Sequence, residues 1–343
     1  MNLPPVIPVD TAGAATWRAL LDGKAKPPGA LGRVEDLAVQ LGLIAGGSPP
    51  AFDKALLLVF AGDHGLTAEG VSAYPSSVTQ AMVATFLAGK ASANAFANAV
   101  GAELRQVDAG VDADLPPHRA LLDRKVRRGT RNAAVEPALT PDEVAQALER
   151  GAQVAREAIA EGFEVLALGE MGIGNTASAA LVMHRLAPAP LADCVGRGTG
   201  HDDAGLARKL ATLERAAARA DATAPEAVLA EFGGLEIAMM AGAVLGAAAA
   251  RVPVLIDGFI VSAAALAAIR LSPAAKDYCV FCHQSAERGH QGMLRALDAS
   301  PLLHLDLRLG EGTGALLALP IVRAASRLLS DVASLDDVLS GRL

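Results

Sequence analysis

The chain has 343 residues, of which 52% are hydrophobic and only 3% aromatic, and its net charge is -7. The charges are interspersed, without the basic stripe that neutralises phosphates, so we expect no nucleic-acid partner. The N-terminus lacks a signal pattern and the Ala-rich helices are interrupted before membrane-spanning length, which predicts a cytoplasmic protein without membrane contact. With no linker, charge block or repeat in the middle, we expect one large domain with a smaller appendage.

The first fifty residues read as a small helical unit. A helix is predicted around Ala14 to Leu21 and an amphipathic one from Leu31 to Leu43, separated by the turn Lys26 to Gly29. The glycines and prolines from Gly46 to Pro50 end this unit. Beyond it, strand-like apolar runs alternate with glycine turns and helical patterns. These runs are Ala55 to Phe60, Glu103 to Val107, Glu164 to Leu168, Val252 to Ile256 and Tyr278 to Cys282. The alternation predicts an α/β fold with a doubly wound parallel sheet, buried on both faces.

Polar, glycine-containing loops follow most of these strand-like runs. They are Ala61 to Gly65, Asp108 to Asp112, Gly169 to Thr176, Asp257 to Gly258, His283 to Ser285 and Gly310 to Gly314. In doubly wound sheets, ligands bind outside the carboxyl ends of the strands. We therefore expect several of these loops to converge on one small polar ligand.

The last of these loops holds the strongest candidate for acid/base chemistry. A strand-like run from Leu302 to Leu309 leads into Gly310-Glu311-Gly312-Thr313-Gly314, followed by a helical run from Ala315 to Leu329. Flanking glycines let a ligand approach the lone carboxylate, and apolar surroundings raise the pKa of such a group. Glu311 is the predicted catalytic residue.

The loop Gly172 to Thr176 leads directly into an Ala-rich helix, Ala177 to Arg185. Backbone N–H groups and the helix dipole make such a helix start a candidate phosphate site, whereas the alternative is a tight turn with an Asn or Thr cap. The glycine spacing does not match the dinucleotide fingerprint, and the Gly-Lys-Ser/Thr ending of a P-loop is missing. A mononucleotide phosphate fits this loop better than a pyrophosphate.

A second glycine turn, Gly196 to Gly200, precedes a helix that carries Arg208 and Lys209. It has two interpretations, completion of the anion site or an ordinary helix start capped by Asp. Past the last strand-like run, Ser285 is a candidate phosphate donor, while His283 and His290 are expected to be scaffold residues.

Three other segments have competing interpretations. Glu236 sits where a first-turn acid would stabilise a helix dipole, which we favour over ligand contact. The loop Gly70 to Pro75, with Gln80 after it, offers a hydroxyl and an amide for a heteroaromatic ring but also fits a plain solvent loop. Cys279 and Cys282 have redox or metal spacing, but no second pair completes a zinc site, so we expect core cysteines.

Taken together, these motifs resemble the nicotinate-nucleotide:dimethylbenzimidazole phosphoribosyltransferase family, whose members assemble the lower-ligand nucleotide of cobalamin. The resemblance covers nearly the whole chain. Its most specific parts are the Gly-Glu-Met-Gly-Ile-Gly-Asn-Thr loop at Gly169 to Thr176 and the segment Leu309 to Gly314. It implies a Rossmann-like large domain at residues 51–311, a small helical domain formed by residues 1–50 and 312–343, and a homodimer.

The resemblance also assigns roles to residues of this chain. Glu311 would be the catalytic base, and Ser72, Gln80 and Leu309 would line the pocket for the aromatic base. The nucleotide and its phosphate would be held by Glu170, Gly172, Gly174, Asn175, Thr176, Gly198, Gly200, Lys209 and Ser285. The implied substrates are nicotinate mononucleotide and a benzimidazole, with no metal and no cofactor.

Four residues depart from the usual pattern of that family. Ala30 stands in place of serine, Ala177 of threonine, Leu235 of phenylalanine and Arg288 of proline, and two of these lie beside the expected phosphate loops. Two rival functions compete with the transferase. A nicotinamide-dependent oxidoreductase conflicts with the glycine spacing, and a non-catalytic nucleotide-binding module would release no nicotinate.

Overall fold

The computed structural model describes residues 3–47, 52–198 and 200–342. Its centre is a parallel six-stranded sheet with the strand order β3-β2-β1-β4-β5-β6. The strands are β1 (Ala55–Gly62), β2 (Glu103–Gly110), β3 (Leu121–Asp123), β4 (Val165–Met171), β5 (Val254–Ile256) and β6 (Cys279–Phe281). The predicted α/β class and doubly wound parallel sheet are confirmed.

Helices cover both faces because each central strand is apolar on both sides. In β1, Leu56 and Leu58 belong to one core cluster and Leu57 and Val59 to the other. The first cluster includes side chains of α5 (Pro141–Ala160), α6 (Asn175–Leu186), α9 (Pro225–Phe232), α10 (Leu235–Ala249) and α11 (Phe259–Leu271). The second includes side chains of α2 (Arg33–Ala45), α3 (Ser77–Leu87), α4 (Ser92–Val100) and α13 (Thr313–Ser330). Because successive side chains of a strand point to opposite faces of the sheet, β1 contributes to a core cluster on each face.

The scarcity of aromatic residues is explained by the packing of α10 on α5. A Cβ atom at Gly151 would lie 1.8 Å from the carbonyl oxygen of Met239, and one at Gly242 would lie 2.0 Å from that of Leu148. The two helix backbones are therefore in direct contact, a spacing that only small residues permit. This close contact replaces bulky aromatic packing in the core.

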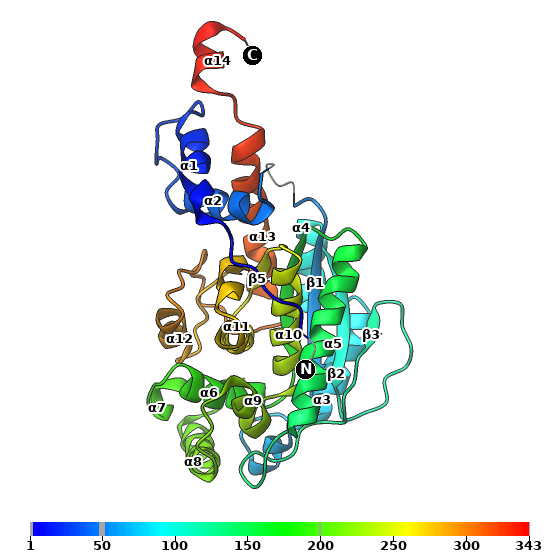
Figure 1. Ribbon diagram of the computed structural model, residues 1–343. Coiled ribbons are helices and arrows are strands. Elements are labelled where there is room, and N and C mark those ends of the chain that lie inside the picture. Colours follow the sequence, from blue (N-terminus) through cyan, green and yellow to red (C-terminus); the bar gives the residue numbers. More distant parts are fainter. Residues whose placement is uncertain (1–2, 48–51, 199, 343) are drawn as a thin grey trace.

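The two chain ends come together beyond one end of the sheet, where α1 (Ala14–Asp22), α2, α14 (Leu335–Ser340) and the outer part of α13 stand apart from the main body (Figure 1). The long helix α13 connects this group to the sheet, and Arg323 on it donates to the carbonyl oxygens of Phe52 and Val100. Within the described residues, α13 alone is long and apolar enough to cross a membrane. Because 56% of it is buried in the fold, it packs as a core helix.

Two sequence predictions need correction. The run Leu302 to Leu309 is not a strand, because only Leu303 forms a bridge, to His283, and Asp306 has a left-handed φ of 54° that breaks the extended path. The short strand β3 was missed because three residues at a sheet edge, two half-buried and one exposed, carry little periodic signal. The remaining α-helices of the described residues are the short α7 (Leu191–Cys194) and α12 (His290–Ala296) and the longer α8 (Asp203–Arg219).

Candidate active site

A pocket of about 620 Å³, its open mouth included, lies at the carboxyl ends of β4, β5 and β6. The chain crosses from one side of β1 to the other at β4, so this is the reversal point at which doubly wound sheets bind ligands. Loops from three strands line the pocket. Its wall includes Glu170, Gly172, Asn175, Thr176, Gly198, Ser285 and Leu309, all predicted site residues.

The loop between β4 and α6 is shaped by its glycines. A Cβ atom on Gly172 would lie 2.3 Å from the carbonyl oxygen of Gly62, and Gly174 has a left-handed φ of 93° and caps α6. Ile173 between them donates its N–H to the Thr79 hydroxyl at 3.1 Å. The bond to Thr79 fixes the loop. The helix α6 starts at Asn175 with its dipole directed at the pocket.

Lys209 of α8 supplies a buried positive charge directly behind this loop. Its side chain is fully buried, and Nζ donates to Thr176 Oγ1 at 2.8 Å and to the Gly196 carbonyl at 3.2 Å. Burial lowers the pKa of Lys209 to about 8, while the nearby Glu287 carboxylate opposes the shift. The charge therefore reaches the pocket through the Thr176 hydroxyl.

Ser285 is held by a histidine that does not face the pocket. The Ser285 N–H donates to His290 Nδ1 at 2.8 Å, so the proton of the neutral ring is on Nε2, which donates to Ser262 Oγ at 2.9 Å. Burial lowers the pKa of His290 to about 3, with a further contribution from His283, which keeps the ring neutral. The Ser285 hydroxyl accepts from the Glu287 N–H at 3.2 Å and keeps its own proton for another partner.

Glu311 sits on a turn of three consecutive left-handed residues. The φ angles of Gly310, Glu311 and Gly312 are 85°, 64° and 79°. Such a conformation is costly for a residue other than glycine and marks stored strain. Gly169 permits the turn, since a Cβ there would lie 2.6 Å from the Glu311 carbonyl carbon.

The Glu311 side chain is buried and does not line the pocket. Its Oε2 accepts the N–H of Ala93, at the start of α4, at 3.3 Å. Burial raises the pKa of Glu311, and the negative charge of Asp257 acts in the same direction. Met171 lies between the two regions, since it lines the pocket and also packs on the apolar cluster of Val83 and Val111.

Glu170 links the pocket wall to this turn. Burial, with Asp257 and Glu236 adding negative charge, raises its pKa to about 8, whereas bonds from the Asn175 amide and the Glu311 N–H oppose the shift. Asn175 and Glu311, on opposite sides of the carboxyl group, are thereby joined. A single buried carboxyl group therefore connects the loop between β4 and α6 to the strained turn at Glu311.

Comparisons with known proteins agree with this geometry. A family model described as phosphoribosyltransferase matches residues 6–338. A nicotinate-nucleotide–dimethylbenzimidazole phosphoribosyltransferase of Cupriavidus necator is 54% identical over 336 residues, 97% of each chain, and one of Dechloromonas aromatica is 53% identical over 92% of each. The crystal structure of CobT from Thermus thermophilus superposes with a TM-score of 0.92 at 45% identity, covering 95% of this chain and 98% of the other. The chain belongs to the nicotinate-nucleotide–dimethylbenzimidazole phosphoribosyltransferase family.

The remaining residues that the family resemblance assigns are less closely grouped. Ser72 and Gln80 lie outside the nucleotide pocket, where the Ser72 hydroxyl accepts from the Tyr74 N–H and Gln80 is exposed on α3. Leu309 lines the pocket with its side chain 55% exposed. Gly200 lines a neighbouring cavity, and Thr199 beside it lies outside the described residues.

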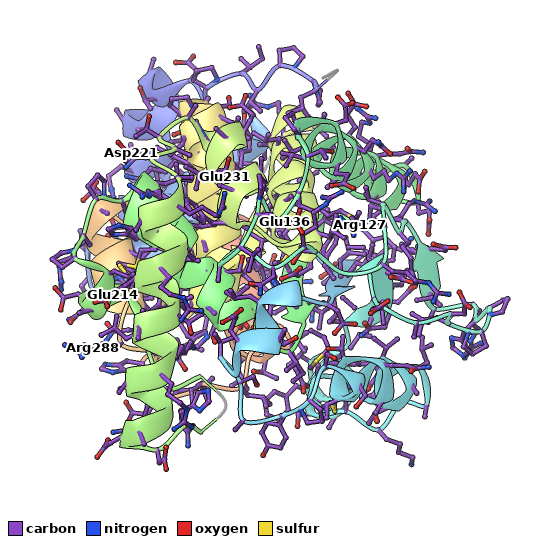
Figure 2. All side chains as sticks on the ribbon, turned by 90° about the horizontal axis from the view of Figure 1, so that it is seen from below. Arg127, Glu136, Glu214, Asp221, Glu231 and Arg288 are labelled. Atoms are coloured by element: carbon purple, nitrogen blue, oxygen red, sulfur yellow. The ribbon has the colours of Figure 1, made fainter. Side chains whose placement is uncertain are left out.

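Two departures from the family pattern have structural explanations. Ala177, in the first turn of α6, is fully buried in the core and does not line the pocket. The Arg288 guanidinium lies 3.5 Å from Asp193, and both side chains are 61% exposed. In Figure 2 Arg288 lies near the edge of the molecule, on the far side of α8 from Arg127. Neither departure alters the pocket.

Four polar residues that line the pocket, Asp257, His283, Glu287 and Arg308, had no predicted site role, although the loops that begin at Asp257 and His283 were expected near the ligand. Asp257 directly follows β5 and His283 lies two residues after β6, which was the available signal, yet His283 was expected to be a scaffold residue. Its Nε2 lies 3.5 Å from Asp257 Oδ1. Arg308 was hidden inside a run misread as a strand. In the described part of the chain, no three His, Cys, Asp or Glu side chains are grouped to hold a metal ion, and all three cysteines are free and buried.

Proposed function

We propose that the protein transfers the phosphoribosyl group of nicotinate mononucleotide to 5,6-dimethylbenzimidazole, giving α-ribazole 5′-phosphate and nicotinate for cobalamin assembly. The relatives named for this reaction support the substrates. The observation that carries the proposal is the pairing of a phosphate-type helix start, backed by buried Lys209, with a buried carboxylate, Glu311, on the adjacent turn.

The chemistry requires a single base. The leaving ring of nicotinate mononucleotide is a cationic pyridinium, so its ring nitrogen becomes neutral on departure and needs no general acid. The incoming benzimidazole attacks C1′ through one ring nitrogen, and the proton on its other nitrogen becomes acidic as the bond forms. Glu311 accepts that proton, which is helped by the raised pKa of its buried carboxyl group.

The 5′-phosphate provides binding energy remote from the reacting bond. We assign it to the start of α6, with the hydroxyls of Thr176 and Ser285 as donors, the Gly198 turn beside them and Lys209 as the counter-charge. Holding the phosphate fixes C1′ in line between the leaving ring and the incoming base. Attack from the opposite face turns the β-nucleotide into an α-nucleotide.

The deciding experiment is a product assay. The purified protein is incubated with nicotinate mononucleotide and a panel of benzimidazoles, purines and phenolics, and the products are separated and identified by mass spectrometry and NMR. We expect equal amounts of nicotinate and an α-linked nucleotide. Release of nicotinate without an α-linked nucleotide would make the protein a hydrolase. Binding of nicotinate mononucleotide without release of nicotinate would make it a binding module.

The assembly and location are also proposed. The helix α14 exposes Leu335, Val338 and Leu339, with Leu339 77% exposed, on the small helical unit formed by both chain ends. We expect a cytoplasmic homodimer that covers this apolar surface. Light scattering of the wild type and of Leu339→Lys tests the dimer, since a monomeric wild type would contradict it.

A further inference from the structure

We propose that Asp257 is a positioning residue for Glu311: it fixes the turn that carries this residue and places a negative charge beside it. The inference rests on the proposed role of Glu311 as the base. Asp257 directly follows β5 and Glu311 lies in the loop before α13, so the two residues are 54 positions apart in the sequence. Their association is a product of the fold.

The Asp257 carboxylate is the acceptor for the backbone that follows Glu311. Its Oδ2 accepts the N–H of Gly312 at 3.2 Å, and Oδ1 accepts that of Ala315 at 3.0 Å. The N–H of Gly314 is directed at the same group. Burial raises the pKa of Asp257, whereas His283 and these N–H groups lower it. Because both oxygens accept, the ionised form satisfies these bonds, and a protonated acid would set an O–H against an N–H.

The turn needs such an anchor. Glu311 has a φ of 64°, and a carboxyl-bearing residue enters this region at a cost that surrounding contacts must offset. Glu170 accepts the N–H of Glu311 itself, and Asp257 accepts the amides on the other side. The backbone is therefore held on both sides of the strained residue, and the side chain of Glu311 accepts the N–H of Ala93.

The charges around Glu311 come from several elements. Burial raises the pKa of Glu311, the Ala93 N–H on α4 lowers it, and Asp257 after β5 adds to the effect of burial. Glu170 on β4 is the other acidic neighbour of the turn, and His283 after β6 faces Asp257. Among these groups, Asp257 is the one that bonds the turn through both oxygens, so it is the one whose removal changes position and charge together.

The test uses Asp257→Asn, which keeps the size of the side chain but turns one acceptor oxygen into a donor. We expect kcat to fall about tenfold or more, because the turn is no longer held in line. Glu311 acts in its ionised form, so kcat rises as the pH passes its pKa. Removing the neighbouring negative charge lowers that pKa, and we expect the acid limb of the kcat profile to move down by about 0.5 to 1 pH unit.

A second variant and a control separate position from charge. Asp257→Glu keeps the charge but displaces the acceptor atoms, so we expect a similar loss of kcat with the acid limb at the wild-type pH; it also serves if Asp257→Asn does not fold. Asp108→Asn is the matched control. Asp108 is a buried carboxylate at the end of β2 that accepts the Val111 N–H at 3.0 Å and lies away from the pocket.

Two results would overturn the inference. One is a folded Asp257→Asn enzyme with kcat within twofold of the wild type, and the other is an acid limb that stays in place. The variant Glu311→Gln distinguishes a failure of the positioning role of Asp257 from a failure of the proposed mechanism. If Glu311→Gln is inactive while Asp257→Asn is unaffected, only the positioning role fails, whereas an active Glu311→Gln removes the base itself.

Discussion

The two sides of the site are built in different ways. On the side proposed to hold the nucleotide, the loop between β4 and α6 and the Gly198 turn provide glycines and a helix start, with the buried Lys209 charge bonded to Thr176 and to the Gly196 carbonyl. On the other side, Glu311 occupies a left-handed conformation and is surrounded by the buried carboxyl groups of Glu170 and Asp257. The proposed binding side thus uses standard local structure, whereas the proposed base lies on a strained turn where burial and the charge of Asp257 disfavour its ionisation.

This difference predicts which substitutions affect binding and which affect turnover. Strain and like charge are maintained at a cost in stability, so they belong where they alter the reactivity of a group. In the proposed mechanism, helix starts and hydroxyl donors hold the substrate equally before and during reaction, so we expect their loss to weaken binding.

Glu311→Gln is expected to have the largest effect. The amide keeps the shape of the side chain and its contact with the Ala93 N–H but accepts no proton, so kcat should fall by at least about 100-fold. Nicotinate mononucleotide should bind with unchanged affinity, since the nucleotide pocket is left intact. Steady-state kinetics and calorimetric titration measure the two quantities, and near-normal turnover would remove Glu311 from its role.

Lys209→Met should weaken substrate binding on the nucleotide side of the site. Methionine fills the buried space without a charge, so we expect the KM for nicotinate mononucleotide to rise about thirtyfold, the scale of a lost charge-assisted hydrogen bond, with a smaller change in kcat. Lys276→Met is the control, because Lys276 is a surface residue paired with Asp298. A large loss of kcat at unchanged KM would place Lys209 in the chemical step.

The pKa of Lys209 adds a pH dependence to this result. With a pKa of about 8, the side chain is charged below pH 8 and loses its proton above it. The wild-type KM should therefore rise between pH 7 and pH 9. Glu170 ionises over the same range and adds negative charge, so Lys209→Met should show a shallower rise, not a flat profile. Measuring KM at half-unit steps in pH separates the two contributions.

Much of the nucleotide side was predictable from the sequence. Apolar runs followed by polar glycine loops placed Gly172, Thr176 and Ser285 at the carboxyl ends of a parallel sheet, and the fold brings them into one pocket with Gly198 of the second glycine turn. These signals are local, since each loop carries its own glycines and hydroxyls. The same reasoning located Glu311, whose flanking glycines are visible in the sequence.

What surrounds Glu311 was not predictable in the same way. The bonds from Gly312 and Ala315 to Asp257 join segments far apart in the chain, and the packing of Glu311 on Gly169 depends on how β4 meets the turn. The sequence pattern also favoured a strand before Gly310, where the left-handed Asp306 makes a loop instead. Long-range hydrogen bonds and backbone strain leave little trace in periodicity.

Ser285→Ala should have a moderate effect on binding. The hydroxyl accepts from the Glu287 N–H and has its own proton to donate, so its loss removes one neutral hydrogen bond to the phosphate. We expect KM for nicotinate mononucleotide to rise about fivefold and kcat to change little. Ser330→Ala, at the outer end of α13, is the control, since the Ser330 hydroxyl donates to the exposed Asp331 beside it. An unchanged KM would place the phosphate elsewhere.

Arg288→Ala should have the smallest effect, although an arginine beside the phosphate loops suggests a role in binding. Its guanidinium pairs with Asp193 at 3.5 Å while both side chains are 61% exposed, and such pairs contribute about 0 to 1 kcal/mol. We therefore expect KM to stay within about twofold of the wild type at physiological ionic strength, where exposed charges are screened. Repeating the measurement at low salt sharpens the test. A KM increase that grows as salt is removed would mean that Arg288 attracts the phosphate from the surface, and the nucleotide side would then depend on more than its buried charge.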